Sequence, residues 1–318
     1  MLSICIPVYN YDVGSLVRDL HLQAEKADYP FEILLMDDAS DEKFRMLNQT
    51  IDLKNVRYIQ LVENIGRAKI RNRLAEEAKY PYLLFMDCDS AVISPWYIKN
   101  YTYFFSPQIV CCGGRKYDDI EPDDSTWLRW KYGLIRECYL PAERRKNPNA
   151  GFQTNNFLIE KSLFEKVKFN EDLDGYGHED TLFGLELLGQ GVIIEHIFNP
   201  LIHLGLETAT DFLEKTENGI ANLYKVELLL RKKYPEYINH SRLMRTKLLL
   251  QKLYLSGFVS MLFSVFRRPM KKYLLGKKPS LRIFDLYRLG LLCREKGERQ
   301  KTKDESLSSS NIVLKIIS

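Results

Sequence analysis

Two aspartates one residue apart, Asp87 and Asp89, directly follow the apolar run Tyr82–Met86. Residues i and i+2 of an extended chain point to the same side, so both carboxylates can face one cation or one phosphate group. Two adjacent negative charges repel each other unless a positive charge lies between them. A divalent cation held by oxygen ligands, with positions left for water and phosphate oxygens, satisfies that requirement. A solvated strand end explains such a pair equally well, so the interpretation depends on the rest of the chain.

The segment Glu63–Asn72 combines a glycine with closely spaced cations. Gly66 permits a tight turn into a helix whose first turn carries Arg67 and Lys69, and helix N-termini with such side chains bind phosphates. Arg67 and Arg71 are four residues apart and share a helix face. We therefore expect these groups to face a diphosphate; the alternative is a solvated basic helix face.

A second acidic cluster follows an aromatic residue between two glycines. Gly175 and Gly177 bracket Tyr176, which allows unusual backbone angles and the close approach of a ligand. Glu179 and Asp180 then open an amphipathic helix. Acidic residues in a first helical turn can simply offset the helix dipole. That alternative accounts for the two acids, but not for the Gly-Tyr-Gly sequence before them.

Two further apolar runs end in groups suited to a nucleotide base. Pro7–Asn10 closes the first run, and the ring of Tyr9 offers a flat face for a base. Asp38 follows the second run, Ile33–Met36, and could accept a hydrogen bond from the imide N–H of a uracil. The alternatives are an ordinary strand end for the first segment and a helix cap for Asp38.

An alternation of short β-rich runs and amphipathic helical stretches must position these clusters. It predicts an α/β fold with a mostly parallel central sheet and helices on both faces, a Rossmann-like arrangement. Ligands of such sheets bind outside the carboxyl ends of the strands, so the four polar clusters should meet in one cleft. The predicted strands are 4–8, 31–36, 57–61 and 82–86, and the predicted helices between them are 13–26, 41–47 and 67–79.

Beyond residue 116 this alternation dissolves. The pattern predicts an acidic turn-rich piece, a helix over 127–138 and a basic loop over 144–149. Long irregular segments inside a compact domain are usually functional or mobile. A compact block over 151–203 and helical patterns from about residue 211 follow.

Composition and charge restrict the classes of protein that fit. The 318 residues are 45% hydrophobic, which suffices for one large core or two modest ones. The net charge of +4 hides an asymmetry, because residues 231–318 carry 21 Lys and Arg against 6 Asp and Glu, whereas residues 1–230 carry 25 against 36. An acidic first part argues against a nucleic-acid surface there and suits metal binding. Six cysteines without a Cys-x-x-Cys pair, and no signal-peptide pattern at the start, predict reduced thiols and a cytoplasmic protein.

Five motifs in this order resemble those of family 2 glycosyltransferases with the GT-A fold, over roughly residues 1 to 210. The block 151–203 is similar to the galactosyltransferase-type C-terminal region attached to many of them. The motifs are Pro7-Val-Tyr-Asn10, Asp37-Asp38, Asn64-x-Gly66 with Arg71-Asn72, Asp87-x-Asp89, and Gly175-Tyr-Gly-His-Glu-Asp180.

On the donor side, the resemblance implies that Asp38 contacts uracil and that Arg71 is a cation near the diphosphate. Asp87 and Asp89 would bind Mn²⁺ or Mg²⁺, and His203 would complete the metal shell. The rival ligand, His196, lies in the apolar run 192–198 and is expected to be structural. The other donor contacts would come from Pro7, Tyr9, Asn10, Asn64, Gly66 and Arg67, together with Asp87.

On the acceptor side, the resemblance implies that Asp180 is the base of an inverting transfer. Burial and the neighbouring Glu179 should raise the pKa of Asp180. Many relatives have Trp where this chain has Tyr176, which leaves the shape of the sugar pocket open. Amides of the segment Gln153–Asn156 could bind sugar hydroxyls without naming the sugar. The expected acceptor and sugar pocket contains Asn155, Asn156, Tyr176, Gly177 and Glu179.

The implied activity is a metal-dependent transfer of a hexose or N-acetylhexosamine from a UDP-sugar to a glycan or lipid-linked acceptor, in surface polysaccharide synthesis. A sugar nucleotidyltransferase would carry a basic Gly-rich loop after the first strand, where Tyr9–Gly14 has none. A non-catalytic membrane-associated protein that binds nucleotide sugars would lack some of the acids. The expected organisation is a catalytic domain over 1–210, with a nucleotide-sugar half (1–116) and an acceptor half (117–210), a helical basic extension over 211–300, and a flexible tail over 301–318.

The basic extension contains an apolar run that is short for a membrane span. Leu253–Phe266 has 14 uncharged residues, whereas a bilayer-spanning helix needs about 20. Ser256, Ser260 and Ser264 form a thin polar stripe, and several Lys and Arg residues follow directly. This combination predicts a helix lying on an anionic membrane, at the inner face of the cell membrane. The alternative is a helix packed on the catalytic core with a solvated basic end.

Overall fold

The computed structural model describes residues 1–27, 29–172, 177–233 and 242–294. The chain forms two compact units. The first unit consists of Met1–Pro122 and Arg129–Leu206, and the second consists of Asp123–Leu128 and the chain from Glu207 onward. The first unit ends at Leu206, and the catalytic domain expected over 1–210 stays a prediction.

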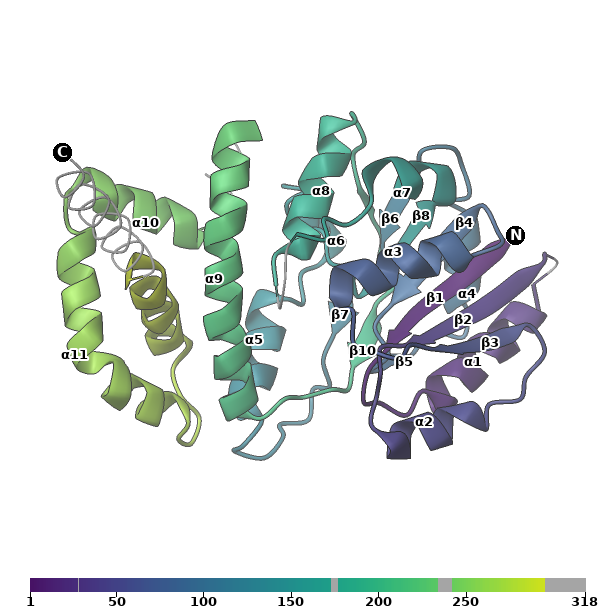
Figure 1. Ribbon diagram of the computed structural model, residues 1–318, viewed down its shortest axis with the longest axis horizontal. Helices are drawn as coiled ribbons and strands as arrows, with labels where there is room; N and C mark the ends of the chain where they lie inside the picture. The colour runs from purple at the N-terminus through teal and green to yellow at the C-terminus, as the bar shows by residue number, and fades with distance from the viewer. Residues whose placement is uncertain (28, 173–176, 234–241, 295–318) are drawn as a thin grey trace, which may run out of the picture. The chain divides into compact units, whose positions relative to one another are not determined.

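Four parallel strands form one half of the main sheet, as the alternation predicted. They are β1 (Leu2–Val8), β2 (Phe31–Asp37), β3 (Val56–Gln60) and β4 (Tyr82–Met86), in the order β3-β2-β1-β4. All residues of β2 are buried, as expected for a parallel strand that is covered on both faces. The carboxyl ends of the four strands therefore lie at one edge of the sheet (Figure 1).

Helices cover both faces of this sheet. Side chains of β2 alternate between the faces, because Leu34 packs in the same core cluster as residues of α3 (Arg67–Glu77), whereas Ile33 packs with residues of α1 (Gly14–Glu25). Two aromatic-rich cores result, one on each face. The α1 side also includes α4 (Tyr97–Thr102), and α2 (Glu42–Gln49) connects β2 to β3.

The second half of the sheet mixes strand directions. It contains β8 (Asn156–Glu160), which runs antiparallel to both β4 and β6 (Val110–Cys112), and β9 (Glu195–His196), which is parallel to β6. α7 (Lys161–Val167) and α8 (Glu179–Gly189) contribute Phe164, Phe183 and Leu187 to the same core cluster as α3. The fold is therefore the predicted α/β arrangement, and its GT-A-like order places β8 beside β4.

A small second sheet brings distant segments next to the end of β4. It consists of β5 (Ser90–Val92), β10 (Leu201–His203) and β7 (Arg115–Lys116), in the order β5-β10-β7. β10 runs antiparallel to β5, with His203 opposite Ser90. This register places His203 directly beside the residue before Ser90.

The basic loop expected over 144–149 has a structural role at its start. Arg144 ends the short helix α6 (Pro141–Arg144), is buried, and donates hydrogen bonds to the carbonyl groups of Cys112 (3.0 Å) and Ile197 (2.8 Å). It also donates to Nδ1 of His196 (2.9 Å), whose Nε2 lies 2.8 Å from the carbonyl oxygen of Pro148. Arg144 is thus a fixed part of the core rather than a loop cation, and the expected structural role of His196 is confirmed.

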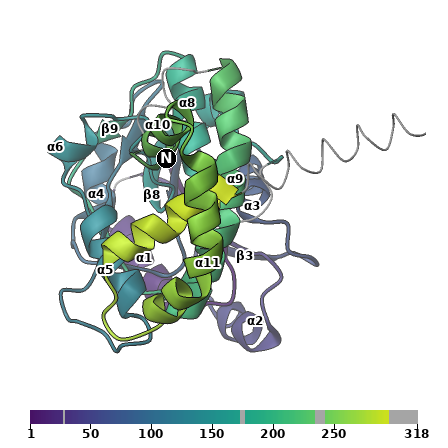
Figure 2. The same cartoon turned by 90° about the vertical axis from the view of Figure 1, so that its left-hand side faces the viewer.

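The second unit is helical in its described part, as expected for the C-terminal extension. It contains α9 (Ala209–Lys233), α10 (Arg242–Lys252), α11 (Ser256–Leu274) and a helix over 281–294, and it receives the start of α5 (Trp127–Arg136) (Figure 2). A buried ion pair joins Glu227 of α9 to Lys247 of α10 at 2.5 Å. The predicted tail over 301–318 lies outside the described residues.

No described helix is by itself long and apolar enough to cross a bilayer; α10 and α11 meet this criterion only when taken together, and they are bent by 116° at the break between them.

Candidate functional site at the carboxyl edge of the sheet

The loop between β3 and α3 is fixed by Asp38. Its carboxylate accepts hydrogen bonds from the backbone N–H groups of Ile65 (2.7 Å) and Gly66 (3.1 Å), and its carbonyl accepts one from the Asn64 side chain. Gly66 has a φ of +84°, which favours glycine, and no neighbour would obstruct a Cβ there. Burial raises the pKa of Asp38, although these two hydrogen bonds oppose the rise. The uracil contact therefore remains a prediction, and the cap of α2 expected as its alternative is not formed.

The turn after β1 is tied to the turn after β2. The backbone N–H of Asn10 donates to the hydroxyl of Ser40 (2.8 Å), and its side-chain oxygen accepts from the N–H of Asp41 (2.7 Å). Asn10 adopts a φ of +50°, and Tyr9 is 54% exposed. Pro7 lies within β1. The exposed Tyr9 ring is free of the core and accessible to a ligand, as a base-stacking role requires.

Asp87 is held between two arginines. Arg71 of α3 donates to its Oδ1 (2.8 Å) and Arg115 of β7 donates to its Oδ2 (3.1 Å). The strand β4 ends at Met86, and Cys88 and Asp89 form a turn that leads into β5. The extended-chain argument for a paired Asp87 and Asp89 therefore does not apply. Both carboxylate oxygens of Asp87 face guanidinium groups, an arrangement that disfavours a further cation at this position.

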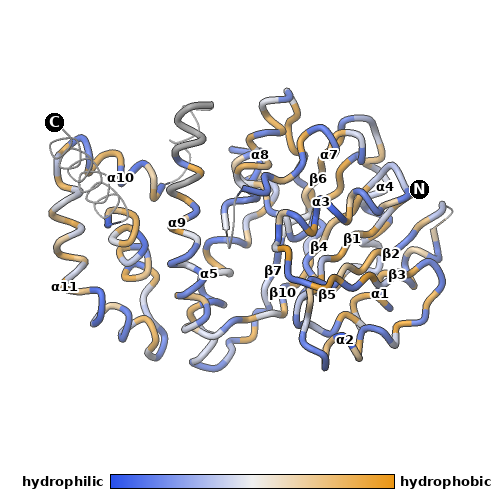
Figure 3. Tube along the Cα trace, viewed as in Figure 1, coloured by the Kyte–Doolittle hydropathy of each residue, from blue (hydrophilic) through white to orange (hydrophobic). Residues whose placement is uncertain are grey.

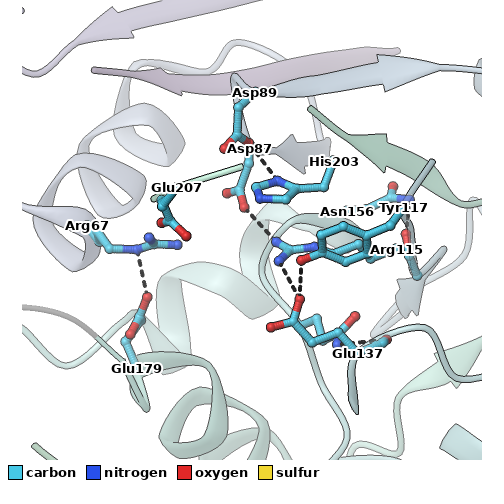
Figure 4. A network of polar contacts seen from close by, with 12 residues as sticks. Arg67, Asp87, Asp89, Arg115, Tyr117, Glu137, Asn156, Glu179, His203 and Glu207 are labelled. Atoms are coloured by element: carbon cyan, nitrogen blue, oxygen red, sulfur yellow. Dashed lines mark hydrogen bonds and ion pairs between the residues drawn. The ribbon is translucent and has the colours of Figure 1, made fainter. Parts of the chain in front are cut away.

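A carboxylate that was not predicted from the sequence, Glu137, anchors this network. Its Oε2 accepts hydrogen bonds from Arg115 (3.1 Å) and Arg129 (3.2 Å) and from the hydroxyl of Tyr117 (Figure 4). Burial opposes its ionisation, but the two guanidinium groups and the phenol outweigh burial and lower the pKa of Glu137 to about 2. Glu137 therefore fixes Arg115, one of the two arginines that hold Asp87. The only sequence signal was the Gly113-Gly-Arg115 stretch after an apolar run.

Asp89 points to His203 rather than to Asp87. Oδ1 of Asp89 lies 3.4 Å from Nδ1 of His203 (Figure 4). Burial opposes ionisation of Asp89, but His203 and Arg115 lower its pKa to about 2. The carboxylate also packs against Gly205, where a Cβ atom would lie 2.3 Å from Oδ2. The predicted neighbourhood of Asp89 and His203 is therefore formed.

The expected set of three metal ligands is not assembled. Among the residues that the structure describes, no three His, Cys, Asp or Glu side chains form a group that could hold a metal ion. Oδ1 of Asp89 and both ring nitrogens of His203 are nevertheless buried without a hydrogen-bond partner, and buried polar atoms are rarely left in this state. Asp89 and His203 therefore fit a divalent cation, with its other positions open. Asp87 does not fit, because both of its oxygens are held by arginines.

The acidic pair at the start of α8 divides into two environments. Oε1 of the buried Glu179 lies 2.9 Å from Nε of Arg67 at the start of α3. Burial opposes ionisation of Glu179, but this guanidinium outweighs burial and lowers the pKa of Glu179. Burial and the charge of Glu179 raise the pKa of the neighbouring Asp180 to about 6. The direction predicted for Asp180 is confirmed. Asp180 is half-buried, and its pKa lies close to neutral pH, which suits a general base.

The turn that leads into α8 has an unusual backbone. Gly177 has a φ of +93°, and His178, which precedes the first helical residue, has a φ of +71°. A non-glycine residue in this region carries conformational strain, which is commonly found at functional sites. Tyr176, the aromatic residue of the predicted sugar pocket, lies outside the described residues.

The two amides expected in the sugar pocket differ. Asn156 is fully buried; its Oδ1 accepts hydrogen bonds from Tyr97 and Tyr101 (2.6 Å each), and its Nδ2 donates to the carbonyl groups of Gly114 and Asn199. Its hydrogen-bonding capacity is used inside the core, so the prediction of a sugar contact for Asn156 is wrong.

The side-chain oxygen of Asn155 is not used within the described part of the protein. Its carbonyl oxygen accepts from the N–H of Asp87 (3.2 Å), while its side-chain Oδ1 is buried without a hydrogen-bond partner. Oε1 of Gln153 is in the same state, and its Nε2 donates to the carbonyl of Glu137. Asn155 and Gln153 therefore remain candidates for hydrogen bonds to a ligand hydroxyl.

Known proteins resemble this chain in sequence and in structure. Chondroitin synthase from Pasteurella multocida (strain Pm70) is 26% identical over 232 residues, which is 60% of this chain and 23% of that protein. Hyaluronan synthase from Pasteurella multocida is 29% identical over 233 residues, 62% of this chain and 24% of that protein. The chain thus spans about a quarter of the length of these two curated relatives.

A solved structure of the mannosyltransferase PcManGT from Pyrobaculum calidifontis, in complex with GDP-Man and Mn²⁺, aligns with a TM-score of 0.49 and 15% identity. The alignment covers 71% of this chain and 63% of that one. Residues 3–168, just over half of the chain, match the family model for Glycosyl transferase family 2. The protein described here is therefore a member of glycosyltransferase family 2.

Proposed function

We propose that this transferase moves a hexose or N-acetylhexosamine from a UDP-sugar to a glycan or lipid-linked acceptor, with inversion at the anomeric carbon and with the help of Mn²⁺ or Mg²⁺. The observation that carries the proposal is Asp180, a half-buried carboxyl group with a pKa of about 6 in the first turn of α8. A carboxyl group with this pKa is ionised at neutral pH and still basic enough to accept a proton.

Asp180 acts as the base in this proposal. It takes the proton from the acceptor hydroxyl while the acceptor oxygen bonds to the anomeric carbon. The bond between that carbon and the diphosphate oxygen breaks, and its electron pair leaves with UDP. Glu179 is already ionised and paired with Arg67, so it holds the start of α8 against α3 and keeps the charge that raises the pKa of Asp180.

The leaving group requires positive charge near the diphosphate. Arg67 and Arg71 lie at the start of α3, where the helix N-terminus adds partial positive charge. Arg71 and Arg115 are oriented by Asp87, so a diphosphate would meet guanidinium groups whose side chains are already ordered. Their fixed positions reduce the reorganisation that transfer would otherwise require.

Asp89 and His203 would hold the divalent cation. Oδ1 of Asp89 and the ring nitrogens of His203, buried without a hydrogen-bond partner, provide a carboxylate oxygen and an imidazole nitrogen. Mn²⁺ accepts both kinds of ligand, and Mg²⁺ accepts the carboxylate. When bound, the cation supplies Lewis-acid stabilisation of the departing diphosphate. Asp87 would orient the arginines beside it rather than bind the cation.

The acceptor is proposed to be a growing glycan. The two curated relatives are named chondroitin synthase and hyaluronan synthase, both of which are polysaccharide synthases by name. Asn155 and Gln153, with buried acceptor atoms that lack partners, would contact sugar hydroxyl groups. A role in surface polysaccharide synthesis follows as part of this proposal.

UDP release in the presence of a panel of UDP-sugars and oligosaccharide acceptors tests the function. The wild-type protein should release UDP with one donor, and Asp180→Asn should lower the rate about 10²–10⁴-fold. Asp172→Asn, which alters an exposed carboxylate in the same segment, is the matched control and should leave the rate unchanged. Transfer by Asp180→Asn at the wild-type rate would refute the base, and transfer undiminished in excess EDTA would refute the cation.

A further inference from the structure

The outward face of α11 is apolar although it is not covered by the described part of the protein. Phe258, Met261, Leu262, Val265 and Phe266 are all exposed, Val265 by 68%. Their spacing of three and four residues places them on one side of the helix. We call these five residues the apolar face. Figure 3 shows the mainly hydrophobic first half of α11 and the hydrophilic segments near its end.

The opposite side of α11 has its own partners, which fixes the rotation of the helix. Phe263 is buried and packs edge-on against Tyr287, with ring centroids 5.4 Å apart. It lies so close to Gly290 that a Cβ there would be 2.2 Å from the Phe263 ring. Further along the same side, Arg267 forms an ion pair with Glu217 (3.0 Å). Turning the apolar face inward would break these contacts, so its exposure is a property of the folded unit.

The bend before α11 extends the apolar surface. Leu253, Tyr254 and Leu255 connect α10 to α11 where the two helices meet at 116°. All three side chains are exposed, and Tyr254 is 93% exposed with a φ of +57°. We call these three residues the apolar corner. These apolar side chains project from a turn of the chain, so they can insert into a deformable apolar layer.

The segment that carries the apolar face has charges of one sign. Residues 242–284 contain eleven Lys and Arg and no Asp or Glu. Arg267 and Lys271 are paired with Glu217 on the inward side, whereas Arg268, Lys272 and Arg282 are exposed. A second copy of the chain would bring the same cations to the interface and repel the first. The complementary partner is therefore an anionic surface that also accepts apolar side chains.

We propose that the apolar corner and the apolar face of α11 dock this protein on the surface of a bilayer that contains anionic lipids. The apolar side chains enter the boundary between headgroups and acyl chains, and the neighbouring Lys and Arg contact the headgroups. The helix lies in the plane of the membrane and does not cross it. The same surface would hold the enzyme at the inner face of the cell membrane, close to a lipid-linked acceptor. In the polar stripe expected from the sequence, Ser256 and Ser260 are only partly exposed and Ser264 is exposed.

Flotation of the full chain with liposomes tests the proposal. The vesicles would be made of phosphatidylcholine alone or of phosphatidylcholine with 30% phosphatidylglycerol, a composition of about one anionic headgroup in three. The wild-type protein should float with the anionic vesicles at low salt, float less at high salt, and stay in solution with phosphatidylcholine alone. A wild-type protein that stays in solution with anionic vesicles at low salt would overturn the proposal.

Matched variants separate docking from folding. Val265→Asp places a carboxylate on the apolar face and should lower vesicle binding at least about 10-fold, whereas Val62→Asp changes a fully exposed valine of the first unit and should bind as the wild type does. Arg268→Glu with Lys272→Glu should also lower binding about 10-fold or more and abolish the preference for anionic lipid. Equal thermal stability of the variants would establish that they fold. The proposal would be overturned if Val265→Asp left vesicle binding unaffected. It would also be overturned if the wild-type protein formed a dimer in the absence of vesicles and Val265→Asp dissociated that dimer.

Discussion

Replacing Glu137 by glutamine is the sharpest test of the buried network. Glu137 faces two guanidinium groups, those of Arg115 and Arg129, and its side chain is 19% exposed. A charge removed from such a buried pair leaves the partners uncompensated, which costs about 3–5 kcal/mol of stability. The pKa gives a second measure, because a fall from 4.5 to about 2 corresponds to about 3 kcal/mol of folding free energy. The two routes agree, and we expect Glu137→Gln to lower the free energy of unfolding by about 3 kcal/mol at pH 7.

The sign of the pH dependence follows from the lowered pKa. The contribution of Glu137 is fully present above pH 4.5, its unfolded value, and is lost as the pH falls toward 2. Urea titrations followed by circular dichroism and tryptophan fluorescence would measure the free energy at several pH values. The wild-type protein should lose this contribution below pH 4.5, and Glu137→Gln should lack it at every pH.

Glu195→Gln provides the control for Glu137→Gln. Glu195 also pairs with an arginine, Arg145, but both side chains are substantially exposed, at 42% and 52%. Exposed pairs contribute less than about 1 kcal/mol. If Glu137→Gln destabilised the protein no more than Glu195→Gln does, with an unchanged denaturant slope, the assignment of Glu137 as the charged anchor of the network would be wrong.

Three further predictions concern the reaction. The rate constant kcat should rise with pH through about pH 6 and then level off, because Asp180 must be ionised to act as a base. Glu179→Gln removes the charge that raises the pKa of Asp180 and should move this inflection to lower pH. An inflection that moves to higher pH in pH–rate profiles would contradict the effect of Glu179 on Asp180. His203→Ala should raise the Mn²⁺ concentration for half-maximal activity at least about 10-fold, and the same increase in the control His21→Gln would exclude a specific role. Gly205→Ala should lower activity, because the new Cβ would lie 2.3 Å from the Asp89 carboxylate. Gly257→Ala is the control, since a Cβ there meets no neighbour, and it should leave activity unchanged. Equal activities of the two variants would refute the role of the contact between Gly205 and Asp89.

The sheet could be predicted because its determinants are local. Apolar runs of five to seven residues separated by amphipathic stretches defined β1, β2 and β4 to within two residues of their observed ends, for example Leu2–Val8 against the predicted 4–8. The carboxyl ends of parallel strands must share one edge, so the four polar clusters were correctly expected there. The pairing of β8 with β4 and β6 was not expected, because no local pattern sets which distant strand forms an antiparallel neighbour.

Within the site, the same division holds. The raised pKa of Asp180 was predicted because its causes, burial and the adjacent Glu179, are close in sequence. The partners of Asp87 were not, because Arg115 is 28 residues away and reaches it only through the small sheet. Asn156 was misplaced for the same reason, since the tyrosines that occupy its amide come from α4.

The sequence by itself determined the α/β architecture, the helical extension, and the chemistry present at each strand end. Periodicity and residue type encode these features over a few neighbouring residues. Only the tertiary structure decided that Asp89 pairs with His203 while Asp87 is held by two arginines. It also decided that Glu137 anchors one of these arginines, Arg115, and that α11 exposes an apolar face. These outcomes depend on strand register and helix rotation, which are set by packing between segments far apart in the chain.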